Sequence, residues 1–375
     1  MKLTLFRAMD ILWYSFLLFL LLWHSRPCRV NPNHLGRETT DAVKGFFIGT
    51  VFFRHFISYM DSRAFWHPID SWFAQLIVVM FLFYSGYGIM IQYEKRGDGY
   101  IRTIPTKRIL STLVNFDIAV LLFGLLGLLM GRAYTIKQLT LSLVGWETVG
   151  NSNWYIFVIL LCYAATFLCF SVPVHRRHHE QMERLFLLGL LLLVYAFVVR
   201  RLKPWHWHDT VFAFWGGVAY GLFHKQVEQL LDRHWLAGLV LGFIGTFAFP
   251  LLPQTERWLW AVHNARALCF ALLVIAATRR FHINCKTLSW CGRNLFPLYI
   301  YQRIPMLICK HFHPAAFAGG DAEKWLPCYF AVSLVATLAI AFAFPLFRYP
   351  WNNPTKPGAP NPICHPAPIS LDSDP

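Results

Sequence analysis

Charged residues are scarce in this sequence, and acidic residues are the scarcest. Only 14% of the 375 residues are charged and 19 of them are acidic, whereas 56% are hydrophobic and the mean hydropathy is +0.43. Soluble domains carry about 25% charged residues, so this composition excludes an ordinary soluble protein. The sequence predicts an all-α polytopic membrane protein.

Paired cysteines are also missing. The nine cysteines form no CxxC or other metal-ligand spacing, and several lie inside apolar runs, where a thiol packs as a small hydrophobic group. We predict neither a disulfide framework nor a metal site. Two histidine-rich stretches, "VPVHRRHHEQMER" (172–184) and "WHWHD" (205–209), are interpreted as a solvated turn and an interfacial aromatic belt.

Two other classes of protein are disfavoured. The formal charge of +15 does not indicate a nucleic-acid partner, because the cations lie in short loops between apolar runs and form no basic stripe on a soluble fold. The internal repeat that marks many transporters is not evident either.

Apolar runs of membrane-spanning length predict about eleven spans. They are 3–23, 45–60, 71–93, 112–131, 153–172, 185–199, 210–223, 236–253, 258–278, 294–311 and 326–347. The first run has no clear small-x-small cleavage site, so we expect a retained anchor. The Pro- and Asn-rich residues 349–375 are expected to form a disordered cytoplasmic tail.

The distribution of Lys and Arg predicts the orientation. Segments 24–44, 94–111, 173–184, 224–235 and 279–293 carry eighteen basic residues, and the alternate internal loops carry eight. The first set is therefore predicted to be cytoplasmic. One loop does not fit this distribution, because "RRLKPWHWHD" (200–209) places three cations on the side predicted to be outside. Either this loop is functional or a span is misassigned.

Ionisable residues interrupt the stretch "TTDAVKGFFIGTVFFRHFISYM" (39–60), where charge is expensive in a membrane. Lys44 and His55 are eleven residues apart, so on a helix they lie within about 20° of one face and about 16 Å apart along the axis. His55 is the best candidate for a general base, since its ordinary pKa lies near 6.5. Alternatively, His55 only bonds to a neighbouring helix and Lys44 only anchors the interface.

Other polar groups also lie within apolar runs. Asp117, Arg266 and Gln302 should face the bundle interior or a cavity. We favour a structural role for Asp117 and leave the role of Arg266 open. The basic segment "YEKRGDGYIRTIPTKRIL" (93–110) is either a solvated cytoplasmic loop or a site for a phosphate-rich donor. Ser85 and the glycines of "FLFYSGYGIM" (81–90) are expected at a close helix contact.

Several short motifs, in this order and spacing, resemble the membrane-bound acyltransferase 3 family over most of residues 39–310. In this family the first core helix begins with an acidic residue, then Arg-Gly, and then a His after ten intervening residues. The matching residues here are Asp41, Lys44, Gly45 and His55, so Lys44 stands where the family has Arg. The other matching positions are Tyr84, Ser85 and Gly86; Arg108 and Ile109, with Pro105 where the family has a first Arg; Trp154 and Tyr155; and Gly292 and Tyr299, with Gln302 in place of the usual His.

The resemblance implies ten core transmembrane helices plus one extra N-terminal span. It predicts an anchor and linker at 1–38, the acyltransferase domain at 39–348 and the tail at 349–375. Acetyl-CoA would be the acyl donor, and the acceptor would be a hydroxyl of a glycan or glycolipid outside the cytoplasm. The expected location is the plasma (inner) membrane, with the lipid bilayer as the surrounding partner.

The resemblance also assigns roles to residues. The expected catalytic residues are His55 and Asp41. The expected donor-binding residues are Lys44, Ser85, Arg102, Lys107, Arg108 and Arg266, and the expected acceptor-binding residues are Trp154, Tyr155, Tyr299 and Gln302. The alternative is a proton-coupled transporter or a flippase of a polysaccharide precursor, in which His55, Asp117 and Arg266 form a relay.

Overall fold

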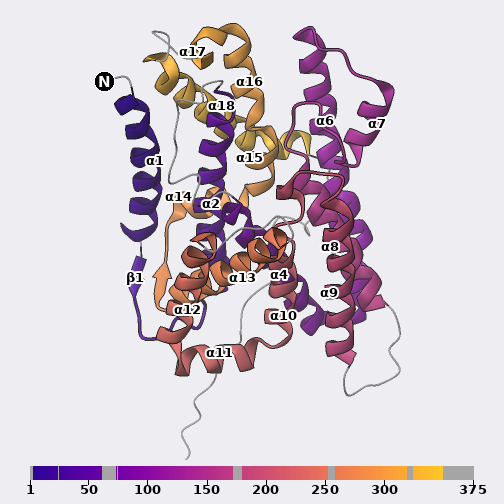
Figure 1. Cartoon of the computed structure of the whole chain (residues 1–375), viewed down its shortest axis with the longest axis vertical. Helices are drawn as coiled ribbons and strands as arrows, with labels where there is room; N and C mark the ends of the chain where they lie inside the picture. Colours follow the sequence, from indigo (N-terminus) through magenta and orange to yellow (C-terminus); the bar gives the residue numbers. More distant parts are fainter. Residues whose placement is uncertain are drawn as a thin grey trace, which may run out of the picture.

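The computed structural model describes residues 3–23, 25–60, 73, 75–171, 180–251, 258–318 and 324–348. Helices make up nearly all of these segments (Figure 1). They are α1 (Leu3–Trp23), α2 (Arg37–Ile57), α4 (Leu76–Arg96), α5 (Asp98–Ile101), the π-helix η1 (Pro105–Leu110), α6 (Ser111–Leu129), α7 (Ile136–Leu143), α8 (Trp154–Ser171), α9 (Glu180–Val199), the 3-10 helix η2 (Trp205–Trp207), α10 (Phe212–Leu222), α11 (His224–Arg233), α12 (Trp235–Ala248), the 3-10 helix η3 (Phe249–Leu251), α13 (Leu259–Thr278), α14 (Lys286–Arg293), α15 (Leu295–Tyr301), α16 (Arg303–Phe312), α17 (Pro314–Ala318) and α18 (Leu326–Phe347).

The described strands are two short antiparallel segments, β1 (Ser25–Pro27) and β2 (Phe281–Ile283), which pair Ser25 with Ile283. Among the described residues, six stretches are helical, long and apolar enough to cross a membrane: α4, Asp98–Leu129, α8, α9, α13 and α18. Residues Met9–Trp23 of α1 and the helix α12 are shorter apolar helices. The chain is therefore an all-α multi-pass membrane protein, and the count of ten core spans stays a prediction.

Several expected spans differ from the helices that form, as the runs 294–311 and 210–223 show. The run 294–311 is two helices, because α15 ends at Tyr301 and α16 begins at Arg303. Pro305 provides a reason, since it lacks the N–H that would bond to the carbonyl of Tyr301 in a continuous helix. The run 210–223 contains the eleven-residue helix α10, which is shorter than a full span.

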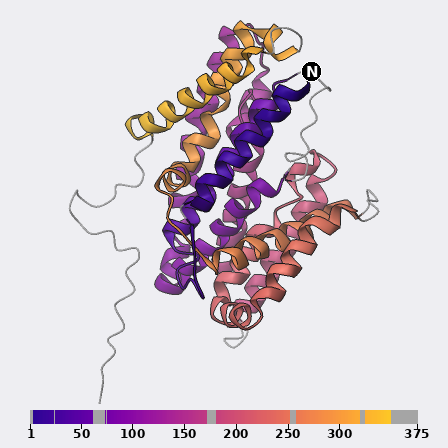
Figure 2. The same cartoon turned by 90° about the vertical axis from the view of Figure 1, so that its left-hand side faces the viewer.

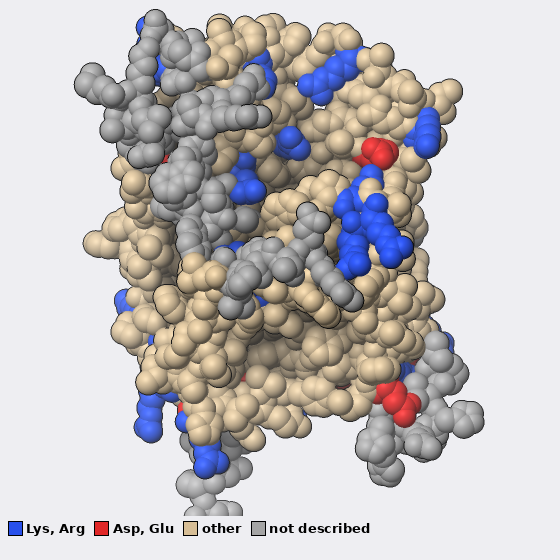
Figure 3. Space-filling view, in the orientation of Figure 1, with Lys and Arg blue, Asp and Glu red and all other residues tan. Residues whose placement is uncertain are grey.

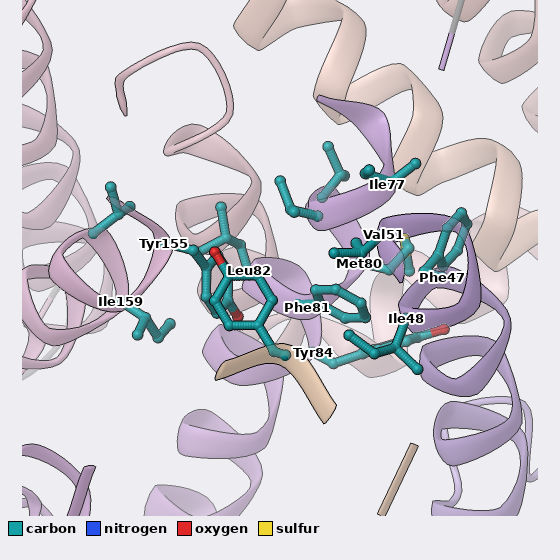
Figure 4. Close-up of a cluster of buried hydrophobic side chains, with 14 of the residues drawn as sticks. Phe47, Ile48, Val51, Ile77, Met80, Phe81, Leu82, Tyr84, Tyr155 and Ile159 are labelled. Atoms are coloured by element: carbon teal, nitrogen blue, oxygen red, sulfur yellow. The ribbon is translucent and has the colours of Figure 1, made fainter. Parts of the chain in front are cut away.

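Large apolar side chains cover both the inside and the outside of the bundle. Figure 4 shows buried side chains of α2, α4 and α8, among them Phe47, Met80, Phe81 and Tyr155, packed together in the core. On the outside, Leu121 and Leu129 of α6 and Phe342 and Leu346 of α18 are each at least 67% exposed. Exposed apolar surface on this scale fits contact with lipid.

Glycines allow two pairs of helices to cross at backbone contact. A Cβ at Gly45 of α2 would lie 1.8 Å from the carbonyl oxygen of Leu288 in α14, and one at Gly292 would lie 1.9 Å from that of Asp41. Helices α4 and α10 make the same kind of contact. A Cβ at Gly86 would lie 2.3 Å from the carbonyl oxygen of Phe214, and one at Gly217 would lie 2.0 Å from that of Phe83. Because α4 and α2 also pack together, these crossings fix the helix that carries His55 relative to α4 and α14.

The segments predicted to be cytoplasmic gather at one end of the bundle. Arg279 pairs with Asp232 of α11 at 2.7 Å and donates a hydrogen bond to His34 at 3.0 Å, while Arg184 at the start of α9 lies 3.9 Å from Asp98 of α5. The strand β1, helix α11 and the start of α9 lie at the lower end in Figure 1, and Figure 2 shows α1 along the side of the bundle. In the space-filling view much of the face is uncharged, and Lys and Arg lie mainly in its upper part and at its lower edge (Figure 3).

Candidate active site

His55 lies near the end of α2 that is farther from β1 and α11. Its ring centroid is 6.0 Å from that of Tyr299 in α15, and Tyr299 lies 5.3 Å from Tyr155 in α8. Trp154 follows at 6.0 Å from Tyr155. The structure thus brings His55 together with three of the four residues expected to bind the acceptor.

The loop before α8 positions Trp154 and Tyr155. The amide of Asn153 donates to the carbonyl oxygens of Gly145 and Glu147 at 2.9 and 3.0 Å, which ties the start of the helix to the loop that follows α7. Asn151 accepts hydrogen bonds from the Thr148 hydroxyl and the Val149 N–H. Because these bonds satisfy the polar groups of a buried turn, the aromatic pair enters the bundle from a defined position.

Two buried polar atoms at the site, the Nδ1 atom of His55 and the hydroxyl of Tyr299, have no well-formed hydrogen bond among the described residues, although the Ser152 hydroxyl lies close enough to Tyr299 to interact with it. A buried polar group without a partner costs about 1–3 kcal/mol, and such groups in a native protein call for an explanation. A bound substrate with polar atoms would provide the missing partners.

Two arginines beside His55 were not assigned to the site from the sequence. The guanidiniums of Arg54 and Arg303 lie close enough to His55 to act on its charge. Arg303 is itself held by the Tyr59 hydroxyl, which accepts its Nε–H at 2.7 Å. The sequence did contain a signal, because both arginines interrupt apolar runs, where an ionisable residue is a candidate for function.

Arg108 lies in the π-helix η1, closer to the predicted cytoplasmic end. Its Nε and Nη2 atoms donate to the Tyr100 hydroxyl at 3.3 Å, and the Tyr163 hydroxyl is a further neighbour. The Arg108 side chain is exposed to solvent. Arg102 and Lys107 are exposed nearby in the chain. These cations are available to an anionic ligand.

Helix α8 connects the Arg108 region with His55. Tyr163 is near Arg108, and Tyr155 is near Tyr299. The two tyrosines are eight residues apart, which corresponds to about 12 Å along a helix. Ser85 of α4, expected at the donor site, interacts with Tyr155 and donates to the carbonyl of Phe81 at 2.8 Å.

Asp41 and Lys44 form an ion pair one turn apart on α2. The Nζ atom of Lys44 lies 2.6 Å from Oδ1 of Asp41, and the Asp41 carboxylate is nearly inaccessible to solvent. Arg37 lies 3.6 Å from the other carboxylate oxygen. The contact has the geometry expected if Asp41 orients Lys44, and it lies about three turns of helix from His55.

Two expected site residues lie outside this group. Gln302 is fully buried, donates to the carbonyl of Tyr299, and lines a largely apolar cavity of about 740 Å3 between α1, α2, α14 and α18. Arg266 of α13 donates to the carbonyl of Thr246 in α12 at 2.8 Å. These hydrogen bonds of Gln302 and Arg266 therefore go to backbone carbonyls and not to His55.

The interpretation of "WHWHD" (205–209) as an interfacial aromatic belt is wrong for most of its residues. Trp205 is exposed, but Trp207, His208 and Asp209 are buried. Lys203 explains the burial of Trp207, because its ammonium lies over the rings of Trp146 and Trp207 at 4.5 and 5.0 Å. The loop folds back into the protein.

This loop also approaches the site. The His206 ring lies 5.5 Å from that of Trp154. Burial lowers the pKa of His206, and the positive charge of Arg54 acts in the same direction, against the nearby Asp209. The lowered pKa favours the uncharged form of the His206 ring beside Trp154.

The comparison with known families agrees with the motifs. A family model described as an acyltransferase domain (Acyl_transf_3) matches residues 38–345. No solved structure matches the chain. The match includes His55, Arg108, Tyr155 and Tyr299 and covers more than half of the sequence, whereas α1 lies outside it.

Proposed function

Because the chain belongs to the acyltransferase 3 family, we propose that it is a membrane O-acyltransferase that uses acyl-CoA, with acetyl as the acyl group. The acceptor would be a hydroxyl of a glycan outside the cytoplasm or of a lipid-linked glycan, and the membrane would be the plasma (inner) membrane. The observation that carries the proposal is the position of His55 among buried polar atoms that lack partners, within a matched family domain.

In this proposal the donor enters from the end where β1, α5 and α11 lie. Arg108, Arg102 and Lys107 would bind the CoA phosphates, since guanidiniums bind phosphate through paired charged hydrogen bonds. Lys44, held by Asp41, adds a further cation at that end. The pantetheine arm would follow α8 past Ser85 and Tyr155, which brings the thioester toward His55.

The chemical step then requires a base and a stabilised oxyanion. His55 accepts the proton of the acceptor hydroxyl while the oxygen attacks the thioester carbonyl carbon. The Tyr299 hydroxyl and the charges of Arg54 and Arg303 favour the negative oxygen that develops. When the carbon–sulfur bond breaks, the proton on His55 passes to the CoA sulfur, and the products are an ester and free CoA. The acyl group moves either directly in this way or through a transient acyl carrier.

The first experiment follows donor cleavage by the purified protein in nanodiscs. Acetyl-CoA is supplied, and the release of free CoA thiol is measured over the uncatalysed rate, with and without a mixture of saccharides. We expect slow hydrolysis without an acceptor and faster thiol release with a competent one. If the protein neither binds acetyl-CoA nor releases thiol, the proposal is wrong.

The transporter alternative requires His55, Asp117 and Arg266 to form a relay. The helix of Arg266, α13, packs mainly on α12, α10 and α4, whereas the helix of Asp117, α6, packs on η1, α7, α8 and α15. Arg266 also bonds to the backbone of α12. The packing therefore favours the acyltransferase over the relay.

A further inference from the structure

A second cavity, of about 540 Å3, lies at the end of α9 opposite to α5 and α11. It is lined by residues of the loop after α9 and of the start of α13, among them Arg200, Arg201, Trp205, Asp209 and Trp260. The reaction proposed above uses none of these residues. The cavity contains the three cations of the loop 200–209, which the distribution of Lys and Arg left unexplained.

Two guanidiniums in this cavity are available to a ligand. Arg201 is exposed and Arg200 is half-buried, and neither lies within 4 Å of an acidic side chain in the described part of the chain. Lys203 is engaged, because its Nζ atom lies 3.0 Å from the Glu147 carboxylate. The guanidinium of Arg200 lies over the Phe197 ring at 4.7 Å, which holds it in place. An anion could therefore bind here without first breaking an ion pair.

Hydrogen bonds make the floor of the cavity rigid. Asp209 is 1% exposed, and its Oδ2 atom accepts a hydrogen bond from His263 Nδ1 at 2.5 Å. The Asn264 amide donates to the carbonyl of His208 at 3.0 Å, and its oxygen accepts the N–H of Phe212. The only described carboxylate that lines the cavity is thus turned toward a histidine, which limits its repulsion of an anion.

Two tryptophans provide flat surfaces in the same cavity. Trp205 is 44% exposed, and its ring lies 6.1 Å from that of His263, while the Trp260 ring lies 5.2 Å from Phe197. An indole ring has an apolar face and a polar edge, which suits the C–H face of a pyranose. Cations beside such rings favour a sugar that carries an acidic group.

Neighbouring rings connect this cavity with His55. Trp205 lies 5.9 Å from His206, and His206 lies 5.5 Å from Trp154. The ring-centroid distances are 6.0 Å from Trp154 to Tyr155, 5.3 Å from Tyr155 to Tyr299 and 6.0 Å from Tyr299 to His55. Five such ring-to-ring steps separate Trp205 from His55, so a glycan held at Trp205 would reach the proposed site of transfer through its further sugar residues.

We propose that this cavity binds an acidic sugar residue, carboxylated or phosphorylated, of the acceptor glycan. Arg200 and Arg201 bind the acidic group, and Trp205 packs against the sugar ring. Asp209 and His263 hold the loop in position. The inference rests on the proposed acyltransferase function and names the class of its acceptor.

The test measures saccharide binding to the full-length protein in nanodiscs by calorimetry, without acetyl-CoA. The probes are D-glucuronate, D-glucose 6-phosphate, D-glucose and inorganic phosphate. We expect one of the two acidic sugars to bind at least tenfold more tightly than glucose, and the better of the two identifies the acidic group. Arg200→Gln with Arg201→Gln should weaken that binding at least tenfold, whereas Arg233→Gln, at an exposed arginine of α11, should not change it.

Trp205→Ala separates a sugar site from a simple anion site. It should weaken the acidic sugar and leave inorganic phosphate unchanged. Equal binding of glucose and the acidic sugars, or binding of inorganic phosphate as tight as that of the better acidic sugar, would overturn the inference. Acetyl-CoA hydrolysis is measured on the same samples: hydrolysis without selective saccharide binding overturns only this inference, whereas a protein that neither binds nor hydrolyses acetyl-CoA overturns the proposed function.

Discussion

At the scale of single residues, the site depends on hydroxyls and rings that lack internal partners. Tyr299 is the central one, since its ring lies between those of His55 and Tyr155 and its buried hydroxyl has only the Ser152 hydroxyl beside it. A tyrosine in this position can donate a hydrogen bond to a developing oxyanion.

Tyr299→Phe should lower turnover by about 10- to 100-fold and leave acetyl-CoA affinity nearly unchanged, because it removes one donor but no volume. Thiol release and equilibrium binding measure the two effects. Tyr301→Phe is the matched control, since Tyr301 is equally buried with an unpartnered hydroxyl but packs on Phe344 and Phe347. Equal loss in both variants would contradict a role for Tyr299 in the chemical step.

The sequence predicted part of this site. Lys44 and His55 stood out because charge within an apolar stretch needs a reason, and Arg108 stood out in a basic segment that matches a family motif. The contact of Asp209 with His263 could not be predicted, since 54 residues separate them and only the folding of the loop onto α13 brings them together. Gln302 shows the opposite case, because the expected continuous helix 294–311 breaks at this residue, which lines a cavity beside α18.

At the scale of helices, glycine contacts set the position of α2. Gly45→Ala would place a methyl group 1.8 Å from a backbone carbonyl of α14, so the helices must separate. Overpacking of this kind costs about 1–3 kcal/mol or more. We expect the apparent melting temperature in detergent to fall by several degrees.

Gly88→Ala is the control for this substitution. A Cβ at Gly88, in the middle of α4, would meet no atom within 4 Å. Alanine is favoured over glycine inside a helix by about 0.5–1 kcal/mol, so this variant should be as stable as the wild type or slightly more stable. A Gly45→Ala protein with unchanged stability would show that α2 and α14 are not in backbone contact.

The link between the β1 segment and α11 should respond to pH. His34 is buried, and its Nε2 atom lies within hydrogen-bond distance of the Tyr220 hydroxyl, at 3.1 Å, and 3.9 Å from the Glu228 carboxylate. Its Nδ1 atom accepts a hydrogen bond from Arg279, which also pairs with Asp232. Burial and the charge of Arg279 lower the pKa of His34 to about 4. The unfolded chain therefore binds a proton below about pH 6.5 that the folded protein binds only near pH 4.

Stability should consequently fall as the pH decreases from about 6.5 to 4, by at most about 3 kcal/mol from this group. Melting temperatures measured across this range would test the prediction. His34→Asn should flatten the pH dependence, whereas His282→Gln, at an exposed histidine of β2, should leave it intact. A His34→Asn protein with the wild-type pH dependence would assign the effect to other groups.

The apolar runs of the sequence predicted the long apolar helices, but they did not predict where a helix is interrupted or where it begins outside an apolar run. The predicted run 3–23 coincides with α1, and 326–347 coincides with α18. By contrast, α2 begins at Arg37, eight residues before the apolar run, because packing against α14 supports a polar first turn. Apolarity alone could not show this helix start.

At the scale of the whole molecule, the account places the donor and acceptor at opposite ends of one bundle. Single-cysteine variants at Lys137 of α7 and at Arg233 of α11 test this orientation, since both positions are exposed. A membrane-impermeant maleimide should label Lys137→Cys in intact cells and Arg233→Cys only after permeabilisation. The reverse pattern would put the Arg108 end outside and remove its access to cytoplasmic acyl-CoA.

The most direct measurement of the central claim compares acetyl-CoA binding with turnover in three purified proteins: the wild type, Arg108→Gln and His55→Ala. We expect Arg108→Gln to weaken acetyl-CoA binding about tenfold or more, because a charged phosphate contact is lost. His55→Ala should keep the wild-type affinity and lose turnover by at least 100-fold, as expected when a general base is removed. Wild-type turnover in the His55→Ala protein would contradict the role of His55 as the general base.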